Sequence, residues 1–328
     1  MTAAQPSWAR RRTLVITAAV GLVALAGAGT ALLRTPFRFV EYRMTDPQDA
    51  PIAIAAANGT VWFTIDHADA IGRVQGNRVE RLPTGGRNIE PVGLAAAADG
   101  SAWYTDIAAR AVARISSSGE ISRFTLDTPM TRLGRLASAP DGAVWFADST
   151  GFSITRLKDG VFTRHGIESP RGGPYGVAAA PDGVVWATLQ GGNQLLRIAP
   201  DGAMTAIDLP RPGAVPSDVA VGTDGAVWFL QFRANRIGQW KDGKFADFEV
   251  GKENAGLSGL AVAGDGAVWF GMMRRASLGR LRDGRIDMFQ LPRANARPYS
   301  LAVDRAGNVW YADITGYVGM LPARHARN

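Results

Sequence analysis

The chain has 328 residues, and its 46% hydrophobic content with 39 Gly and 18 Pro favours a globular protein with many turns. The absence of Cys excludes disulfides, thiolate metal sites, a cysteine nucleophile and a lipoprotein anchor. The formal net charge of +7 comes almost entirely from Arg, which suits planar recognition of carboxylate or phosphate groups, although a solvated basic surface explains it equally well.

Residues 1–36 precede the repeats and have the features of an export segment. Arg residues at positions 10–12 come before an uncharged apolar run over residues 13–33. That run is long enough for a membrane-spanning helix, since about 20 residues suffice. Small residues at 24–28 also resemble a signal-peptide cleavage site. We therefore expect a cleaved signal peptide or, as the length favours, an uncleaved membrane anchor. Either places the remaining chain outside the cytoplasm, anchored on the outer side of the membrane, periplasmic or secreted.

Residues 37–46 alternate apolar and polar side chains, as a half-buried strand does. They match the last segment of the repeat units that follow, whereas the final unit, residues 298–328, lacks that segment. We expect residues 37–46 to supply the outer strand of the last unit and so to close the structure without an unpaired sheet edge.

A repeat of 41 or 42 residues runs through the rest of the chain. Each unit has a Gly three residues before a Trp, and the repeated Trp residues are Trp62, Trp103, Trp145, Trp186, Trp228, Trp269 and Trp310. Self-similarity near this period, with several short strand signals per unit, predicts a repeat architecture. The chain is expected to be all-β: one seven-bladed β-propeller of four-stranded blades over residues 37–328, preceded by the signal or anchor helix.

The fourth unit shows the four strands of one blade. Small residues at 174–180 suit the crowded innermost strand, and the Asp182-Gly183 turn leads to the Trp186 strand. A loop follows, then two outer strands joined at Asp201-Gly202. Both Asp-Gly turns fall on one face of the ring. The loop after the Trp strand and the link between blades fall on the other, which we call the upper face and consider the candidate functional face.

Several units carry Pro-x-Gly followed by an aliphatic residue, then Trp, then Ile-Gly-Arg or a related sequence. The clearest examples are Pro91–Leu94 with Trp103–Asp106, Pro174–Val177, Ile71–Arg73 and Asn235–Gly238. This repeat resembles the virginiamycin B lyase (streptogramin lyase) family over residues 37–328. The resemblance implies the propeller fold, and it says less about chemistry because one fold supports many functions.

The family resemblance also implies a reaction, the magnesium-assisted opening of a cyclic depsipeptide by elimination. That reaction uses histidines at the entrances to the inner strands of the last two blades, with glutamates nearby. The histidine positions correspond here to Ser258 and Tyr299, and the glutamate positions to Arg297 and Ile314. None of these is a ready base at neutral pH, and Arg297 places a cation where a magnesium ligand is expected. We therefore expect a divergent member that lacks the lyase residues.

The residue three positions after each Trp is expected at the upper face. The seven occupants are Ile65, Asp106, Asp148, Leu189, Gln231, Met272 and Asp313. With Asp66, the acidic members form an expected arc on blades seven, one, two and three. This arc is a candidate Mg²⁺ or Ca²⁺ site, with Asp66, Asp106, Asp148 and Asp313 as ligands. His67 and Asp313 are the candidate catalytic residues. Turn capping by each Asp is the simpler alternative.

The opposite part of the upper face is expected to be basic and aromatic. The candidate ligand-binding residues are Arg233, Arg236, Arg274, Arg275 and Arg297, with Tyr175, Tyr299 and Arg135 lining the central rim.

Two functions are consistent with these features. The first is an exported binding or sensing propeller that recognises a small molecule or peptide with anionic groups, without the family's lyase chemistry. The second is a metal-assisted lyase or hydrolase that uses the acidic arc. Carboxylate oxygens within about 5 Å of a common point would favour the second. We expect a monomer and no nucleic-acid partner, because the positive charge is not gathered on a helix or accompanied by interleaved aromatic residues.

Overall fold

The computed structural model describes residues 39–66, 68–85, 91–127, 132–168 and 173–327, so the predicted export segment and His67 lie outside it. Phe39–Asn328 form one compact unit. In the described part of the chain, no helix is both long and apolar enough to span a membrane.

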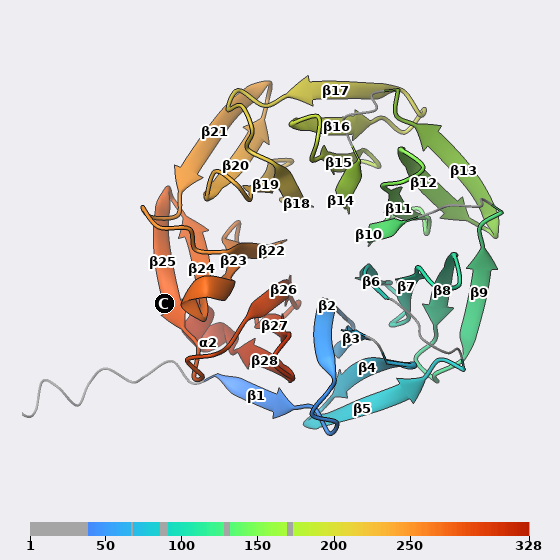
Figure 1. Cartoon of the computed structure of the whole chain (residues 1–328), viewed down its shortest axis with the longest axis vertical. Helices are drawn as coiled ribbons and strands as arrows, with labels where there is room; N and C mark the ends of the chain where they lie inside the picture. The colour runs from blue at the N-terminus through green and yellow to red at the C-terminus, as the bar shows by residue number, and fades with distance from the viewer. Residues whose placement is uncertain (1–38, 67, 86–90, 128–131, 169–172, 328) are drawn as a thin grey trace, which may run out of the picture. The chain divides into compact units, whose positions relative to one another are not determined.

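Seven antiparallel sheets of four strands make up this unit, which confirms the predicted all-β, seven-bladed propeller. The sheets are arranged around a central axis, with the first strand of each blade innermost (Figure 1).

The strands are numbered in chain order and grouped by blade. Blade 1 consists of β2 (Ala50–Ala57), β3 (Thr60–Asp66), β4 (Ala70–Gln75) and β5 (Arg78–Pro83). Blade 2 consists of β6 (Leu94–Ala96), β7 (Ala102–Asp106), β8 (Ala111–Ile115) and β9 (Ile121–Thr125). Blade 3 consists of β10 (Leu133–Ser138), β11 (Val144–Asp148), β12 (Ser153–Lys158) and β13 (Val161–Gly166). Blade 4 consists of β14 (Pro174–Ala179), β15 (Val185–Leu189), β16 (Gln194–Ile198) and β17 (Met204–Asp208). Blade 5 consists of β18 (Pro216–Val221), β19 (Val227–Gln231), β20 (Arg236–Lys241) and β21 (Lys244–Glu249). Blade 6 consists of β22 (Leu257–Val262), β23 (Val268–Met272), β24 (Ser277–Arg282) and β25 (Arg285–Gln290). Blade 7 consists of β26 (Pro298–Val303), β27 (Val309–Asp313), β28 (Tyr317–Leu321) and β1 (Val40–Arg43).

Two short helical segments complete the described chain. The 3₁₀ turn η1 (Met273–Arg275) follows the Trp strand of blade 6, and α2 (Ala323–Ala326) follows β28.

The repeated Trp residues pack between neighbouring blades. Trp62 and Trp269 are fully buried, and three others are 7% exposed. Trp103 and Trp228 are only half-buried, so the seven positions are not equivalent. In five blades the cross-strand partner of the Trp is an Arg, as at Trp62 and Arg73, where the guanidinium carbon lies 5.4 Å from the ring centroid.

The residue after the Trp explains the Gly of the Ile-Gly-Arg pattern. In blades 1, 5, 6 and 7 an aromatic ring lies over a Gly on the next strand, in the pairs Phe63/Gly72, Phe229/Gly238, Phe270/Gly279 and Tyr311/Gly319. A Cβ on any of these glycines would lie 2.0–2.2 Å from the ring, closer than atoms can approach. Blade 4 reverses the sizes, with Ala187 paired to Leu196. Complementary volumes therefore fill the space between blades.

Strand β1 is the outer strand of blade 7 and pairs antiparallel with β28. Its Glu41 carboxylate accepts hydrogen bonds from Tyr311 Oη at 2.8 Å and from the Arg293 guanidinium at 3.1–3.3 Å. Burial and the Glu41 charge raise the pKa of Tyr311, so its phenol stays a donor. Tyr42 stacks on Trp310 with ring centroids 6.2 Å apart. The strand expected within residues 37–46 is thus held by buried polar and aromatic contacts.

Removing the closing strand is expected to destabilise the propeller. A chain that begins at residue 48 loses the β1 ladder and leaves Arg293 and Tyr311 without Glu41. This should remove a large part of the about 5–15 kcal/mol typical of folded proteins. Thermal and urea unfolding compared with a chain that begins at residue 35 measures the effect. Equal unfolding curves for the two chains would contradict it.

Replacing the ladder Trp residues should give unequal losses of stability. Trp62→Ala should cost about 3–5 kcal/mol, because the side chain is fully buried. Trp228→Ala should cost less, since that ring is half-buried. Urea unfolding of both variants measures the difference, and a larger loss for Trp228→Ala would show that burial does not determine the contribution of this ladder.

Candidate functional site

Two hollows lie at the upper face and share Met273 and Tyr299. The first, of about 260 Å³, is surrounded by the inner strands of blades 3 to 7, and we call it the central hollow. The second, of about 630 Å³, lies between blades 6 and 7, where η1 meets the 294–297 link, and we call it the blade 6–7 hollow.

An ion pair crosses the central hollow. Arg135 on β10 approaches Asp218 on β18 with Nη2 and Oδ2 3.8 Å apart, and both side chains are nearly buried, at 13% and 15% exposed. The other terminal nitrogen of Arg135 donates to Ser300 Oγ at 3.3 Å, whereas its Nε has no hydrogen-bond partner among the described residues. The side chain therefore connects blades 3, 5 and 7 and retains an unused donor.

The phenols of Tyr175 and Tyr299 complete the wall around Arg135. The Arg135 guanidinium carbon lies 5.9 Å from the Tyr299 ring centroid. Burial lowers the pKa of Arg135, but Asp218 and the two tyrosines outweigh it and raise the pKa above its ordinary value. Burial and the neighbouring Tyr175 raise the pKa of Tyr299 to about 12. Tyr299 is consequently a neutral hydrogen-bonding group at neutral pH.

The blade 6–7 hollow carries two exposed guanidinium groups. Arg274 comes from η1, and Arg297 comes from the link that enters β26. The Arg297 backbone N–H donates to Asp313 Oδ1 at 3.0 Å, which fixes the start of that strand. Neither guanidinium is paired with another side chain in the part of the chain that the structure describes. These cations are therefore available to an anionic group.

The other candidate arginines do not line either hollow. Arg236 pairs with Asp247 and Glu249 on β21, at 2.6 and 3.0 Å. Arg275 contacts the Glu253 carbonyl at 3.3 Å, and Arg233 is exposed on the loop after β19. Of the five arginines expected on the basic part of the upper face, Arg274 and Arg297 line the blade 6–7 hollow.

Three of the four carboxylates of the expected acidic arc accept hydrogen bonds from nearby groups of the chain. Asp106 accepts from the Ala109 N–H at 3.0 Å, and Asp148 accepts from the Gly151 N–H at 2.9 Å. Asp313 is fully buried and accepts from Arg293, from Thr315 and from the Arg297 N–H. Asp66 ends β3 in a half-buried position. No group of three or more His, Asp or Glu side chains that could hold a metal ion occurs among the described residues. Asp106, Asp148 and Asp313 accept from N–H groups of the turns that follow them, which is the capping role.

The positions that correspond to the family's histidines and glutamates do not fit a magnesium centre. Ser258 Oγ donates to the Pro298 carbonyl and thereby joins blades 6 and 7. Tyr299 faces Arg135, Arg297 is a cation, and Ile314 is apolar. Mg²⁺ sites in proteins usually include one or two carboxylates, and this set supplies none.

Asp218 is the residue of this site that the sequence analysis did not single out. It occupies the same inner-strand position as Arg135, where the other blades have Ala, Gly or Ser. Aligning the seven repeats shows one positive and one negative residue at a position that is otherwise small, and this contrast could have identified Asp218 from the sequence.

The protein is a seven-bladed β-propeller, and its upper face has two hollows of the size that small molecules occupy. A sequence model of the virginiamycin B lyase family matches residues 32–133 and 79–325, so the chain belongs to this family.

Individual relatives agree with that assignment. Virginiamycin B lyase of Nocardia farcinica (strain IFM 10152) is 36% identical over 156 residues, which cover 48% of this chain and about half, 53%, of that protein. The structure of a catalytically inactive virginiamycin B lyase from Staphylococcus aureus with quinupristin has a TM-score of 0.82 and 24% identity, over 87% of this chain and 99% of that one. A streptogramin B lyase structure gives the same score and identity over 86% and 96%. At this identity the structural match concerns the fold.

Proposed function

We propose that the protein is a binding propeller of the virginiamycin B lyase family, which recognises a small molecule or peptide with anionic groups at its upper face. The observation that carries this proposal is the pair of exposed guanidinium groups, Arg274 and Arg297, in the blade 6–7 hollow. Arg binds carboxylate and phosphate groups in a planar, bidentate manner. Tyr299 connects this hollow to the central one, so a ligand longer than a single anionic group can extend toward Arg135 and Tyr175. We further propose export, because residues 10–33 have the features of an export signal.

Family membership favours a second function, a metal-assisted lyase or hydrolase. The chemistry of the corresponding residues argues against the family's reaction. A phenol with a pKa of about 12 stays protonated at neutral pH, and the Ser258 hydroxyl is already donated to a carbonyl. Neither group is a ready general base. We therefore rank binding above catalysis.

The binding proposal is tested with N-acetyl-phenylalanyl-glutamate, a dicarboxylate that combines an apolar group with two anionic ones. Isothermal titration calorimetry should show salt-sensitive binding. Arg274→Gln and Arg297→Gln should each weaken it about tenfold or more, because a hydrogen bond to a charged group is worth about 1.5–3 kcal/mol. Arg282→Gln, on the opposite face, removes the same charge and serves as the control. Binding that is unchanged in both hollow variants would contradict the proposal.

The second function is tested with streptogramin B antibiotics. The purified protein should not open their ring above the background rate, since loss of a positioned base alone removes about 10²–10⁴ in rate. Combining Ser258→His, Tyr299→His, Arg297→Glu and Ile314→Glu should restore part of the activity. Liquid chromatography of the linear product measures both. Magnesium-dependent ring opening by the unmodified protein that disappears in His67→Ala would establish the lyase function instead.

A further inference from the structure

The residues three positions after the seven repeated Trp residues fall into two structural groups, with one exception. Ile65, Leu189 and Met272 are buried apolar side chains that fill the space between blades. Asp106, Asp148 and Asp313 cap turns, as described above. The exception is Gln231, which is only 4% exposed. Its amide forms no hydrogen bond within the described chain, and its polar atoms remain accessible to solvent in the hollow that Gln231 lines.

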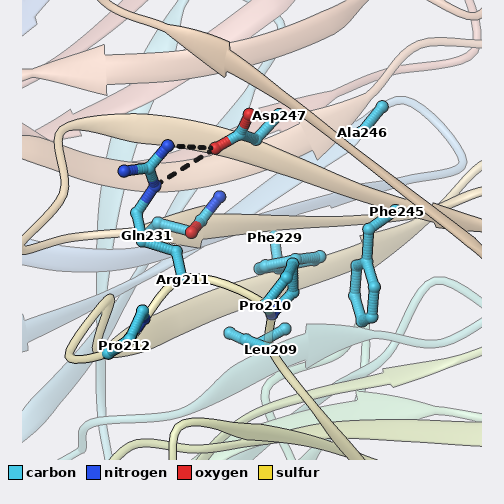
Figure 2. Close-up of a pocket in the computed structure, with 9 residues that line it drawn as sticks. All are labelled: Leu209, Pro210, Arg211, Pro212, Phe229, Gln231, Phe245, Ala246 and Asp247. Atoms are coloured by element: carbon cyan, nitrogen blue, oxygen red, sulfur yellow. Dashed lines mark hydrogen bonds and ion pairs between the residues drawn. The ribbon is translucent and has the colours of Figure 1, made fainter.

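Gln231 lines a hollow of about 320 Å³ where the link 209–212 that leaves blade 4 passes over blade 5, separate from the two hollows already described. We call it the blade 4–5 hollow. Figure 2 shows its polar and apolar sides. Gln231, Arg211 and Asp247 lie toward one side, and the apolar side chains lie toward the other. The apolar group consists of Leu209, Pro210, Phe229 and Phe245. The proline-rich link 209–212 forms the rim, where Pro210 and Pro212 are exposed, so the hollow is open to solvent.

Blade 7 contains the equivalent place in a filled form. Leu291-Pro292-Arg293 corresponds to Leu209-Pro210-Arg211, and Asp313 corresponds to Gln231. In blade 7 the Arg293 guanidinium binds the Asp313 carboxylate at 2.5 Å. In blade 5 the residue at that position is a neutral amide, so Arg211 has no carboxylate to bind there. In blade 7 Arg293 also binds Glu41, and Asp247 occupies the matching position in blade 5. The blade 4–5 hollow therefore keeps the arginine and one of its two carboxylates but lacks the one that Asp313 provides.

Arg211 is held only weakly by the carboxylate that it does contact. Its nitrogens lie 3.2 and 3.3 Å from Asp247 Oδ2, and its side chain is 46% exposed. Arg236 binds the same carboxylate more closely, at 2.6 Å, and also pairs with Glu249. Asp247 would keep its partner if Arg211 turned toward another anion. The ion pairs of Arg211 thus leave it available to a ligand.

We propose that the blade 4–5 hollow binds a small aromatic carboxylate, whose carboxylate lies between Arg211 and Gln231 and whose ring packs on Pro210 and Phe245. The ligand carboxylate replaces the one that Asp313 provides in blade 7. The Gln231 amide donates one hydrogen bond, and the Arg211 guanidinium donates a charge-assisted pair. The apolar wall supplies the burial that distinguishes an aromatic acid from acetate or phosphate.

The probe for this site is phenylacetate, with phenylacetamide as the neutral compound of the same shape. The full-length protein is titrated with each, by calorimetry and by ligand-observed NMR. Phenylacetate should bind at least about tenfold more tightly than phenylacetamide, the difference expected for one charge-assisted interaction. Equal affinity for the two compounds, or no binding of phenylacetate up to about 10 mM, would overturn the proposal.

Two variants assign the binding to this hollow. Arg211→Gln should weaken phenylacetate binding about tenfold or more. Gln231→Asp recreates the blade 7 arrangement, so its own carboxylate should occupy Arg211 and abolish binding while the melting temperature is maintained or raised. Arg282→Gln, which removes a cation from the opposite face, should leave the affinity unchanged. Loss of binding in Arg274→Gln with retention in Arg211→Gln would place phenylacetate in the blade 6–7 hollow and overturn this inference.

Discussion

The packing of an aromatic ring over a glycine, found in blades 1, 5, 6 and 7, constrains which side chains can fill the space beside the Trp strand. Phe229 over Gly238 and Tyr311 over Gly319 show its geometry, because any Cβ at these glycines would overlap the ring. The ring occupies the space that a side chain at the glycine would need. Where the large residue moves to the other strand, as at Leu196, the partner becomes Ala187. Blades 2 and 3 pair the aromatic residue with Ala113 and Thr155, so the small partner need not be glycine in every blade. The residues at the upper end of each strand vary more widely.

A second constraint acts at the central axis, where the inner strands converge. A Cβ at Gly176 would lie 2.4 Å from the Ser217 carbonyl of the next blade, so small residues are required there for close approach. Arg135 and Asp218 are the exceptions to this rule, and their side chains meet across the central hollow. One long cation and one anion then occupy the space that small residues leave. This pair gives the central hollow its polar character without adding net charge.

The fold was predictable from the sequence because the repeat, the Gly turns and the strand alternation all point to the same structure. The candidate site was predictable only in part. Arg135, Tyr175 and Tyr299 do meet around one hollow, since their place at the start of the inner strands follows from topology. The acidic arc does not assemble, because an Asp at a strand end is closer to the N–H groups of its own loop than to a carboxylate of the next blade. Periodicity places a residue on a face, whereas the local turn decides where its side chain points.

Because the chain repeats the same blade seven times, each position in one blade can be compared with the equivalent positions in the other six. Five residue types occupy one backbone position in the seven blades, so the structural requirement at that position can be inferred from what most of the blades have there. Asp313 satisfies the demand with its own carboxylate and Leu189 with apolar volume. Gln231 satisfies neither, because it presents a polar amide without a hydrogen-bond partner in the described chain to the hollow that it lines. The same reasoning applies to Arg297, which has a charge where neither packing nor capping requires one. In a propeller, departures from the blade consensus that bring no structural gain are therefore the places where ligand recognition is best sought.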